Sequence, residues 1–238
     1  MVPVLEWTLS LMGVDKSITM NIAVATSMAT IIPTSISSSR AHARRAAVDY
    51  PIARAWALPI VAGAIAGTLI VAHVRSNVLV GVFGFIALAA AVKMLLPLDG
   101  VVLRGSVPVG VRSAWLPAAI GLISTLMGIG GGTVSVPAMT LCSQPVHRAV
   151  GTAAFIGLWI SVPATAGFLL APAPHELTPP LSVGYVNLIA LALIAPATWL
   201  LAPVGAALGH RLSKRALSIT FGVFLCIVAV RMLYRITK

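Results

Sequence analysis

Consecutive glycines stand in the middle of an otherwise apolar stretch of the sequence. The stretch 113–146 has no charged or histidine side chain, and its centre holds Gly128, Gly130, Gly131 and Gly132. Glycine breaks helices because it adopts backbone conformations closed to other residues. A broken helix exposes N–H groups, and such groups bind anions without a costly buried lysine. The chemistry predicted for this segment is the binding of a small anion by backbone N–H groups.

Pro137 follows the glycines and is expected at the start of a second half-helix, where its missing N–H costs little. Close packing of helices is the alternative use of glycine in a membrane. Packing motifs space their glycines by four residues, however, whereas these glycines are consecutive. The pattern therefore favours a binding turn, with packing as the simpler alternative.

Hydroxyl side chains form the second group that could contact an anion. Those in the apolar stretch 17–39 include Thr26, Ser27, Thr34, Ser35, Ser37 and Ser38, and Thr152 matches Thr26 in a later stretch. Serine and threonine in membrane helices usually bond back to their own helix, so each one alone has a structural alternative. As a cluster, they are candidate donors to an anion.

A basic segment follows these hydroxyls and contains His42 and Arg44. Its simplest role is to anchor the chain at the cytoplasmic side, where arginine and lysine gather in membrane proteins. The functional alternative is a vestibule that attracts anions, or a gate linked to protons, because histidine titrates near neutral pH.

Composition places all these residues in a membrane protein. Of the 238 residues only 9% are charged and 59% are hydrophobic, and the mean hydropathy is +1.02. A soluble domain is about one-quarter charged. The net charge of +11 could indicate a nucleic-acid partner, but the basic residues are spread between apolar stretches. That distribution is typical of membrane topology, so no nucleic-acid partner is expected.

Enzymatic chemistry has no support in the sequence. The five acidic residues are not paired at catalytic spacing, and the glycine run lacks the lysine of a nucleotide-binding loop. Cys142 and Cys226 lie in apolar sequence, and the histidines are scattered singly. We therefore expect no catalytic residue, no metal and no cofactor.

The uncharged stretches predict an all-α integral membrane protein. Six single helices are expected, at roughly 18–36, 54–73, 77–96, 149–170, 183–208 and 214–234. The glycine-containing segment 115–141 either crosses the membrane or enters and returns as a re-entrant hairpin. The loop 171–182 has four prolines and no lysine or arginine, which predicts the non-cytoplasmic side.

An internal repeat divides the chain. Val92-Lys93-Met94-Leu95 recurs as Val230-Arg231-Met232-Leu233 at an offset of 138, and Ala23-Val-Ala-Thr26 matches Ala149-Val-Gly-Thr152 at 126. These matches predict two transmembrane repeats, 1–96 and 115–238, joined by a cytoplasmic linker at 97–114. Equivalent loops have opposite charge bias, which favours inverted repeats.

The first repeat is expected to be incomplete at its N-terminus. Val2-Pro3 matches Val136-Pro137, but the second repeat has a glycine-bearing segment before its Val-Pro, whereas only Met1 precedes the first. A truncated or mis-started chain is the favoured explanation.

Together these motifs resemble the TauE/SafE family of sulfite exporters. The resemblance is carried by the glycine run with Val136-Pro137, by Ala25-Thr26-Ser27 leading into Thr34–Ser38, by Ala41-His42-x-Arg44, and by Val48-Asp49. The first-half glycine motif that the family would show is absent. The resemblance implies a multi-pass transporter of small sulfur-containing anions, such as sulfite or organosulfonates, in a bacterial-type inner membrane.

Several properties stay open at this point. Transport would be driven by protons as coupling ion or by the substrate's own gradient, and assembly into a homo-oligomer is compatible with the sequence. A passive anion channel and a membrane scaffold without transport are the alternatives to a carrier. The expected partners are the lipid bilayer and a small anionic substrate.

Overall fold

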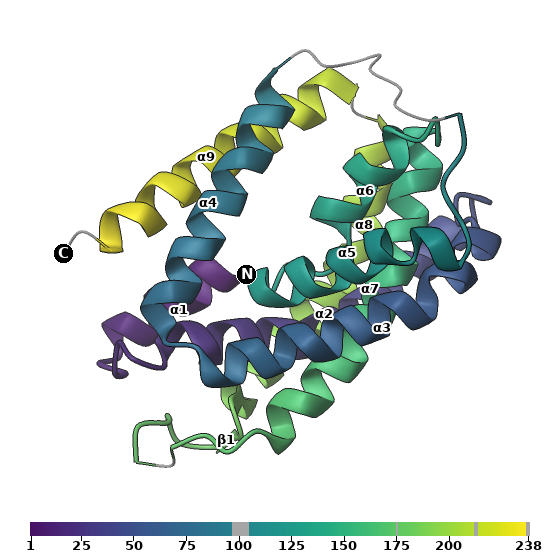
Figure 1. Cartoon of the computed structure of the whole chain (residues 1–238). Helices are drawn as coiled ribbons and strands as arrows, with labels where there is room; N and C mark the ends of the chain where they lie inside the picture. Colours follow the sequence, from purple (N-terminus) through teal and green to yellow (C-terminus); the bar gives the residue numbers. More distant parts are fainter. Residues whose placement is uncertain (97–104, 175, 212–213, 237–238) are drawn as a thin grey trace.

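The structure, a computed structural model, describes residues 1–96, 105–174, 176–211 and 214–236, and it is built almost entirely of helices (Figure 1). The helices are α1 (Val2–Leu11), α2 (Thr19–Ala43), α3 (Tyr50–His73), α4 (Ser76–Leu95), α5 (Trp115–Met127), α6 (Gly132–Thr140), α7 (Val146–Leu170), α8 (Leu188–Arg211) and α9 (Lys214–Ile236). A 3-10 turn, Val111–Ser113, precedes α5. Strands β1 (Ser182–Val183) and β2 (Val186–Asn187) form an antiparallel hairpin before α8. The all-α prediction is confirmed.

Four of the described helices are long and apolar enough to cross a membrane: α2, α3, α7 and the Leu188–Leu208 part of α8. The helices α4 and α9 contain shorter apolar segments, Ser76–Val92 and Gly222–Tyr234. Helices satisfy their own backbone hydrogen bonds, which lipid cannot do for them. The chain is therefore a multi-pass membrane protein.

Helix α2 lies at the centre of the bundle. Every residue from Thr19 to Thr30 is buried, and α2 packs against α1, α7 and α8. The buried stretch is rich in alanine, serine and threonine, and small side chains let membrane helices approach closely. A helix without charge in these positions can occupy the core without unpaired ions.

The loops gather at two ends of the bundle. At one end of the bundle, which we call the basic end, the end of α2 near Arg44 meets the starts of α3 and α7 near Arg54 and Arg148. The backbone N–H of Asp49, just before α3, donates to Thr152 near the start of α7 and joins these two helices. The opposite end, the hairpin end, holds the β1–β2 hairpin and the loop around Asp15. There the side-chain and backbone hydrogen bonds of Ser17 lower the pKa of Asp15.

Helices α5 and α6 form a re-entrant hairpin. Trp56 near the start of α3 donates to the Pro108 carbonyl just before α5, and Gln144 just after α6 donates to Asp49. The hairpin therefore starts and finishes at the basic end. Its turn reaches the middle of the bundle, where Gly131 lies against Ile156, near the centre of α7. Of the two alternatives for this segment, the structure has the re-entrant one.

Several helix bounds differ from the sequence prediction. Helix α2 continues to Ala43 rather than ending near 36, since Pro33 is accommodated inside it. Helix α3 begins at Tyr50 because Asp49 caps it, and its Pro51 suits a first turn. The hairpin takes 182–187, so α8 starts later than predicted. Helix α1 was not predicted. Most of the expected linker, 97–104, lies outside the described residues.

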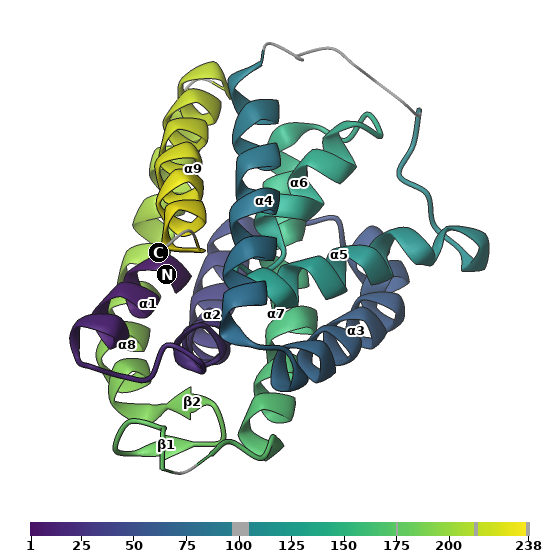
Figure 2. The ribbon, with the colours of Figure 1, turned by 60° about the vertical axis from the view of Figure 1, so that its left-hand side comes forward.

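Helices α3 and α5 pack so closely that glycine is required at their contact. A Cβ atom at Gly63 would overlap the Ala118 carbonyl oxygen, and one at Gly121 would overlap the Ile60 carbonyl oxygen. Each glycine therefore lies against the backbone of the opposite helix. The helices α4 and α9 form a second close pair beside the bundle, as both views show (Figures 1 and 2).

Replacing Gly63 with leucine should destabilise the protein. Overpacking of this kind costs about 1–3 kcal/mol, so the melting temperature of Gly63→Leu in detergent should fall clearly below that of the wild type. Gly205→Leu is the matched control, because no atom lies within 4 Å of a Cβ at Gly205 in α8. Equal melting temperatures for the two variants would contradict the packing of α3 on α5.

Candidate functional site

The helix break between α5 and α6 depends on two glycines in left-handed backbone conformations. Gly128 ends α5 with φ 61° and ψ 29°, and Gly130 has φ 71°. Both conformations are unfavourable for residues with a Cβ atom. The N–H groups of Gly128 and Ile129 donate to the carbonyls of Thr125 and Ser124, so the end of α5 is closed by its own backbone. The predicted break at the glycines is confirmed.

The turn is packed between α1, α2 and α7. A Cβ atom at Gly128 would lie 2.6 Å from the Val2 side chain in α1, and one at Gly130 would lie 3.3 Å from Ile31 in α2. The Ser27 hydroxyl of α2 donates to the Gly128 carbonyl at 2.7 Å, in a fully buried contact. This hydrogen bond fixes the turn at the centre of the bundle.

Helix α6 begins with unsatisfied N–H groups. Its N-cap is Gly131, and no side chain caps it. The N–H groups of the first turn, from Gly132 to Val134, have no carbonyl acceptor within the helix. Gly132 is exposed, and no atom lies within 4 Å of a Cβ position there. A small acceptor can therefore reach the start of α6 from this side.

Pro137 does not start the second half-helix, so that expectation is wrong. Helix α6 begins five residues earlier, at Gly132, and Pro137 lies inside it. The reason is that Gly131 already has helical angles, with φ −67° and ψ −23°. Because proline lacks an N–H, it leaves the carbonyl one turn before it without an intrahelical donor.

Buried hydroxyls without a hydrogen-bond partner lie on the helices that form or contact the turn. Within the part of the chain that the structure describes, these are Ser124 and Thr125 on α5 and Ser135 on α6, with Ser161 and Thr165 on α7. A buried hydroxyl with no partner is costly unless a ligand or water satisfies it. The sequence patterns did not single out these residues, although three of them stand within four residues of the glycine run.

Thr26 and Thr152 hold other helices in place rather than lining the glycine turn. The Thr26 hydroxyl accepts the backbone N–H of Asn187 at 3.0 Å, just before α8. The Thr152 hydroxyl accepts the backbone N–H of Asp49 at 2.8 Å, just before α3. The two contacts tie the start of α8 to α2 and the start of α3 to α7.

The remaining predicted residues are spread along α2. Ser35 lies against Gly157 of α7, and Ser38 is half-buried one turn further on. His42 is buried in the last turn of α2, whereas Arg44 is exposed at its C-cap. Fifteen residues separate His42 from Ser27, or about 22 Å along a helix. The structure therefore brings Ser27 to the glycine turn and places His42 and Arg44 at the basic end.

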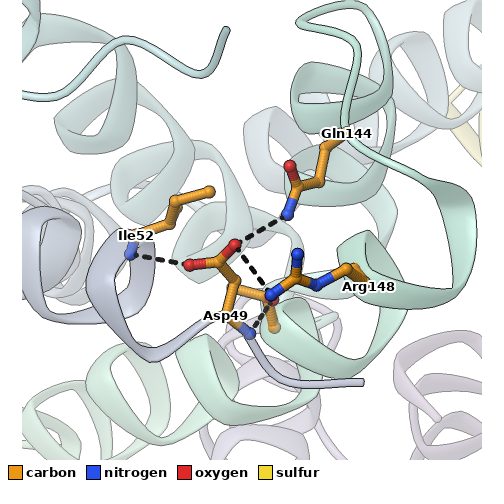
Figure 3. A network of polar contacts seen from close by, with 5 residues as sticks. Asp49, Ile52, Gln144 and Arg148 are labelled. Carbon is orange, nitrogen blue, oxygen red and sulfur yellow. Dashed lines mark hydrogen bonds and ion pairs between the residues drawn. The ribbon is translucent and has the colours of Figure 1, made fainter. Parts of the chain in front are cut away.

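A polar network surrounds Asp49 at the basic end (Figure 3). Its carboxylate accepts the backbone N–H of Ile52 at 3.3 Å, which caps α3. It also accepts from Gln144 at 3.0 Å and pairs with Arg148 at 3.5 Å. The described residues contain no group of three histidine, cysteine or acidic side chains that could hold a metal ion.

Thr26→Val and Thr152→Val should destabilise the protein to a similar degree. Each change leaves one buried or partly buried N–H without its acceptor, at a cost of about 1–3 kcal/mol. The matched controls Thr26→Ser and Thr152→Ser keep the hydroxyl. Thermal unfolding in detergent measures the difference, and valine variants as stable as the serine variants would contradict these two contacts.

Comparison with known proteins gives an assignment for this architecture. The family model described as "Sulfite exporter TauE/SafE" matches residues 1–232. A probable membrane transporter protein of Haemophilus influenzae is 28% identical over 97% of this chain and 88% of its own length. The probable membrane transporter protein YunE of Bacillus subtilis is 24% identical over 98% and 88%. No solved structure gives a significant match. The chain thus belongs to the TauE/SafE family and is a membrane transporter.

Proposed function

We propose that this transporter carries small sulfur-containing anions, such as sulfite or organosulfonates, across the bacterial inner membrane. The anion binds at the turn Gly128–Gly132. The observation that carries this proposal is the uncapped start of α6, which is open to a ligand at Gly132 and has buried, unpartnered hydroxyls in the adjoining helices. The family name supports the class of substrate.

Neutral donors suit a transported anion. Helices α5 and α6 contain no lysine or arginine, so these two helices offer an arriving anion N–H groups, hydroxyls and the positive end of a helix dipole. These donors compensate for lost water without leaving a buried cation behind after release. A tightly paired arginine would hold the anion more strongly and slow its exit. The site therefore favours reversible binding, which a carrier needs.

The proposed inverted repeat accounts for the two states that a carrier needs, one open to each side of the membrane. Helices α1 and α6 both start beside the glycine turn, and α1 runs to the hairpin end while α6 runs to the basic end. The pair α1 and α2 corresponds to α6 and α7, and the contact of α2 with α8 corresponds to that of α7 with α3. Such inverted halves allow a central site to open alternately to either side.

Two matched hydrogen bonds support the same symmetry. Thr26 and Thr152 are equivalent at the offset of 126, and Asn187 and Asp49 are equivalent at 138. Thr26 accepts from Asn187, and Thr152 accepts from Asp49. Both Asn187 and Asp49 also cap the helix that follows them, through the N–H three residues on. The basic end, with its excess of arginine, faces the cytoplasm under this proposal.

Gly131→Leu should abolish most transport. A side chain there would press on Ile156, Ile160 and the Ala153 carbonyl, and would push the start of α6 away from its place. Each lost hydrogen bond to a charged ligand is worth about 1.5–3 kcal/mol, so uptake of labelled sulfite into proteoliposomes should fall at least about tenfold. Gly205→Leu is the control, and both variants are compared after size-exclusion chromatography shows equal amounts of folded protein.

Transport by folded Gly131→Leu at the wild-type rate would contradict the site. Counterflow of labelled sulfite tests the carrier itself, because only a carrier is accelerated by unlabelled substrate on the opposite side. Flux without such acceleration would indicate the channel. No flux of sulfite or of any organosulfonate, together with a stable co-purifying protein, would indicate the scaffold.

A further inference from the structure

The starts of α3 and α8, which correspond in the proposed repeat, differ in charge. The residue that caps the helix is Asp49 at the start of α3, at the basic end, and the neutral Asn187 at the start of α8, at the hairpin end. Arg148 lies beside Asp49, but the residue of α2 that corresponds to Arg148 at the offset of 126 is Ile22. Ile22 is fully buried and apolar. The symmetry of the backbone is therefore not accompanied by a symmetry of charge.

At the basic end the side chain of Asp49 joins three parts of the chain. One carboxylate oxygen accepts the N–H of Ile52 in α3. The other accepts from Gln144 in the α6–α7 loop and pairs with Arg148 in the first turn of α7. The carboxylate residue is 14% exposed and Arg148 is 51% exposed. Moving the start of α3 away from α7 would separate a largely buried carboxylate from two of its three donors.

At the hairpin end the side chain of Asn187 stays within its own segment. Its amide donates to Pro180 and Ser182 of the preceding loop, and its carbonyl accepts from Ala190 in α8. These partners would move with α8 as one piece. Only the N–H of Asn187 reaches the core helix α2, through Thr26. Opening this end would break neutral hydrogen bonds, those of the Asn187 and Tyr185 N–H groups to Thr26 and to the Phe168 carbonyl of α7, and no ion pair among the described residues.

We propose that Asp49, Gln144 and Arg148 form a latch that holds the basic end closed. The inference rests on the proposed alternating access of the carrier. Because Asn187 and Ile22 provide no equivalent latch at the hairpin end, the two ends open with unequal ease, and the resting protein favours the state closed at the basic end. Asp49 and Arg148 are positioning residues that set this balance without contacting the substrate.

A cavity beside the latch provides a way to observe its opening. The cavity has a volume of about 350 Å³, and its walls include Ile52, Gln144 and the thiol-bearing Cys142. Gln144 thus belongs to the latch and to the cavity wall at once. Cys142 is 8% exposed in this closed arrangement. Release of Gln144 and the start of α7 would uncover the thiol, two residues away in the same loop.

The test measures the reaction of Cys142 with a membrane-impermeant maleimide in lipid nanodiscs, where both faces of the protein are accessible. The background variant is Cys226→Ser, so that Cys142 is the sole thiol. Asp49→Asn retains the helix cap, because asparagine caps as well as aspartate and occupies the equivalent position 187. Labelling of Asp49→Asn should be about fivefold faster, since a charged contact of this kind is worth roughly 1 kcal/mol.

Arg148→Gln should accelerate labelling in the same way, and the double variant should add little to either single change. Asn187→Asp is the matched control and should label at the background rate, because the partners of the Asn187 side chain among the described residues are the uncharged Pro180, Ser182 and Ala190. Equal rates for all these variants, or effects of Asp49→Asn and Arg148→Gln that simply multiply, would overturn the latch. Circular dichroism before labelling separates latch opening from unfolding, and Arg148→Gln changes an exposed side chain that the fold tolerates.

The labelling needs no substrate, so its result is independent of the proposed cargo. Faster labelling together with sulfite counterflow supports both proposals. Faster labelling in a protein that moves no anion would contradict the proposed function. The contacts of Asp49 with Gln144 and Arg148 would then only stabilise the fold. Sulfite counterflow with unchanged labelling would leave the carrier intact and contradict the latch.

Discussion

A backbone inside a membrane must satisfy its own hydrogen bonds, and this constraint governs the whole structure. Most of the chain meets it with helices. The turn between α5 and α6 departs from it at the centre of the bundle. The end of α5 is satisfied by its own last carbonyls, and the Gly128 carbonyl is satisfied by Ser27. The first N–H groups of α6 remain without an intrahelical acceptor. An anion is the ligand that such a group of donors suits best.

The surrounding helices give this turn a fixed place. Helix α2 supplies Ser27 and the surface on which Gly130 packs, and α7 supplies the surface against Gly131. The same two helices hold the starts of α8 and α3 through Thr26 and Thr152. The proposed binding turn and the starts of α8 and α3 are therefore held by one pair of core helices.

The sequence predicted the helices and the break well, because both depend on local composition. Uncharged stretches mark the spans, and the consecutive glycines mark the turn. It predicted less well what depends on contacts between distant segments. The start of α3 required the cap by Asp49, and the place of Pro137 depended on the angles of Gly131. The hydroxyl of Thr26 was expected near the anion, but it accepts from Asn187, 161 residues away. Helix propensity carries no information about such partners.

The N–H groups at the start of α6 are the proposed binding site of the anion. The most direct measurement is nuclear magnetic resonance of the protein in nanodiscs with nitrogen-15 in glycine only, titrated with sulfite and separately with chloride at equal ionic strength. We expect saturable shifts of the amide signals of Gly131 and Gly132 with sulfite, while the signal of Gly205 in α8 stays unchanged. Saturable binding of sulfite that leaves the signals of Gly131 and Gly132 in place would contradict this site.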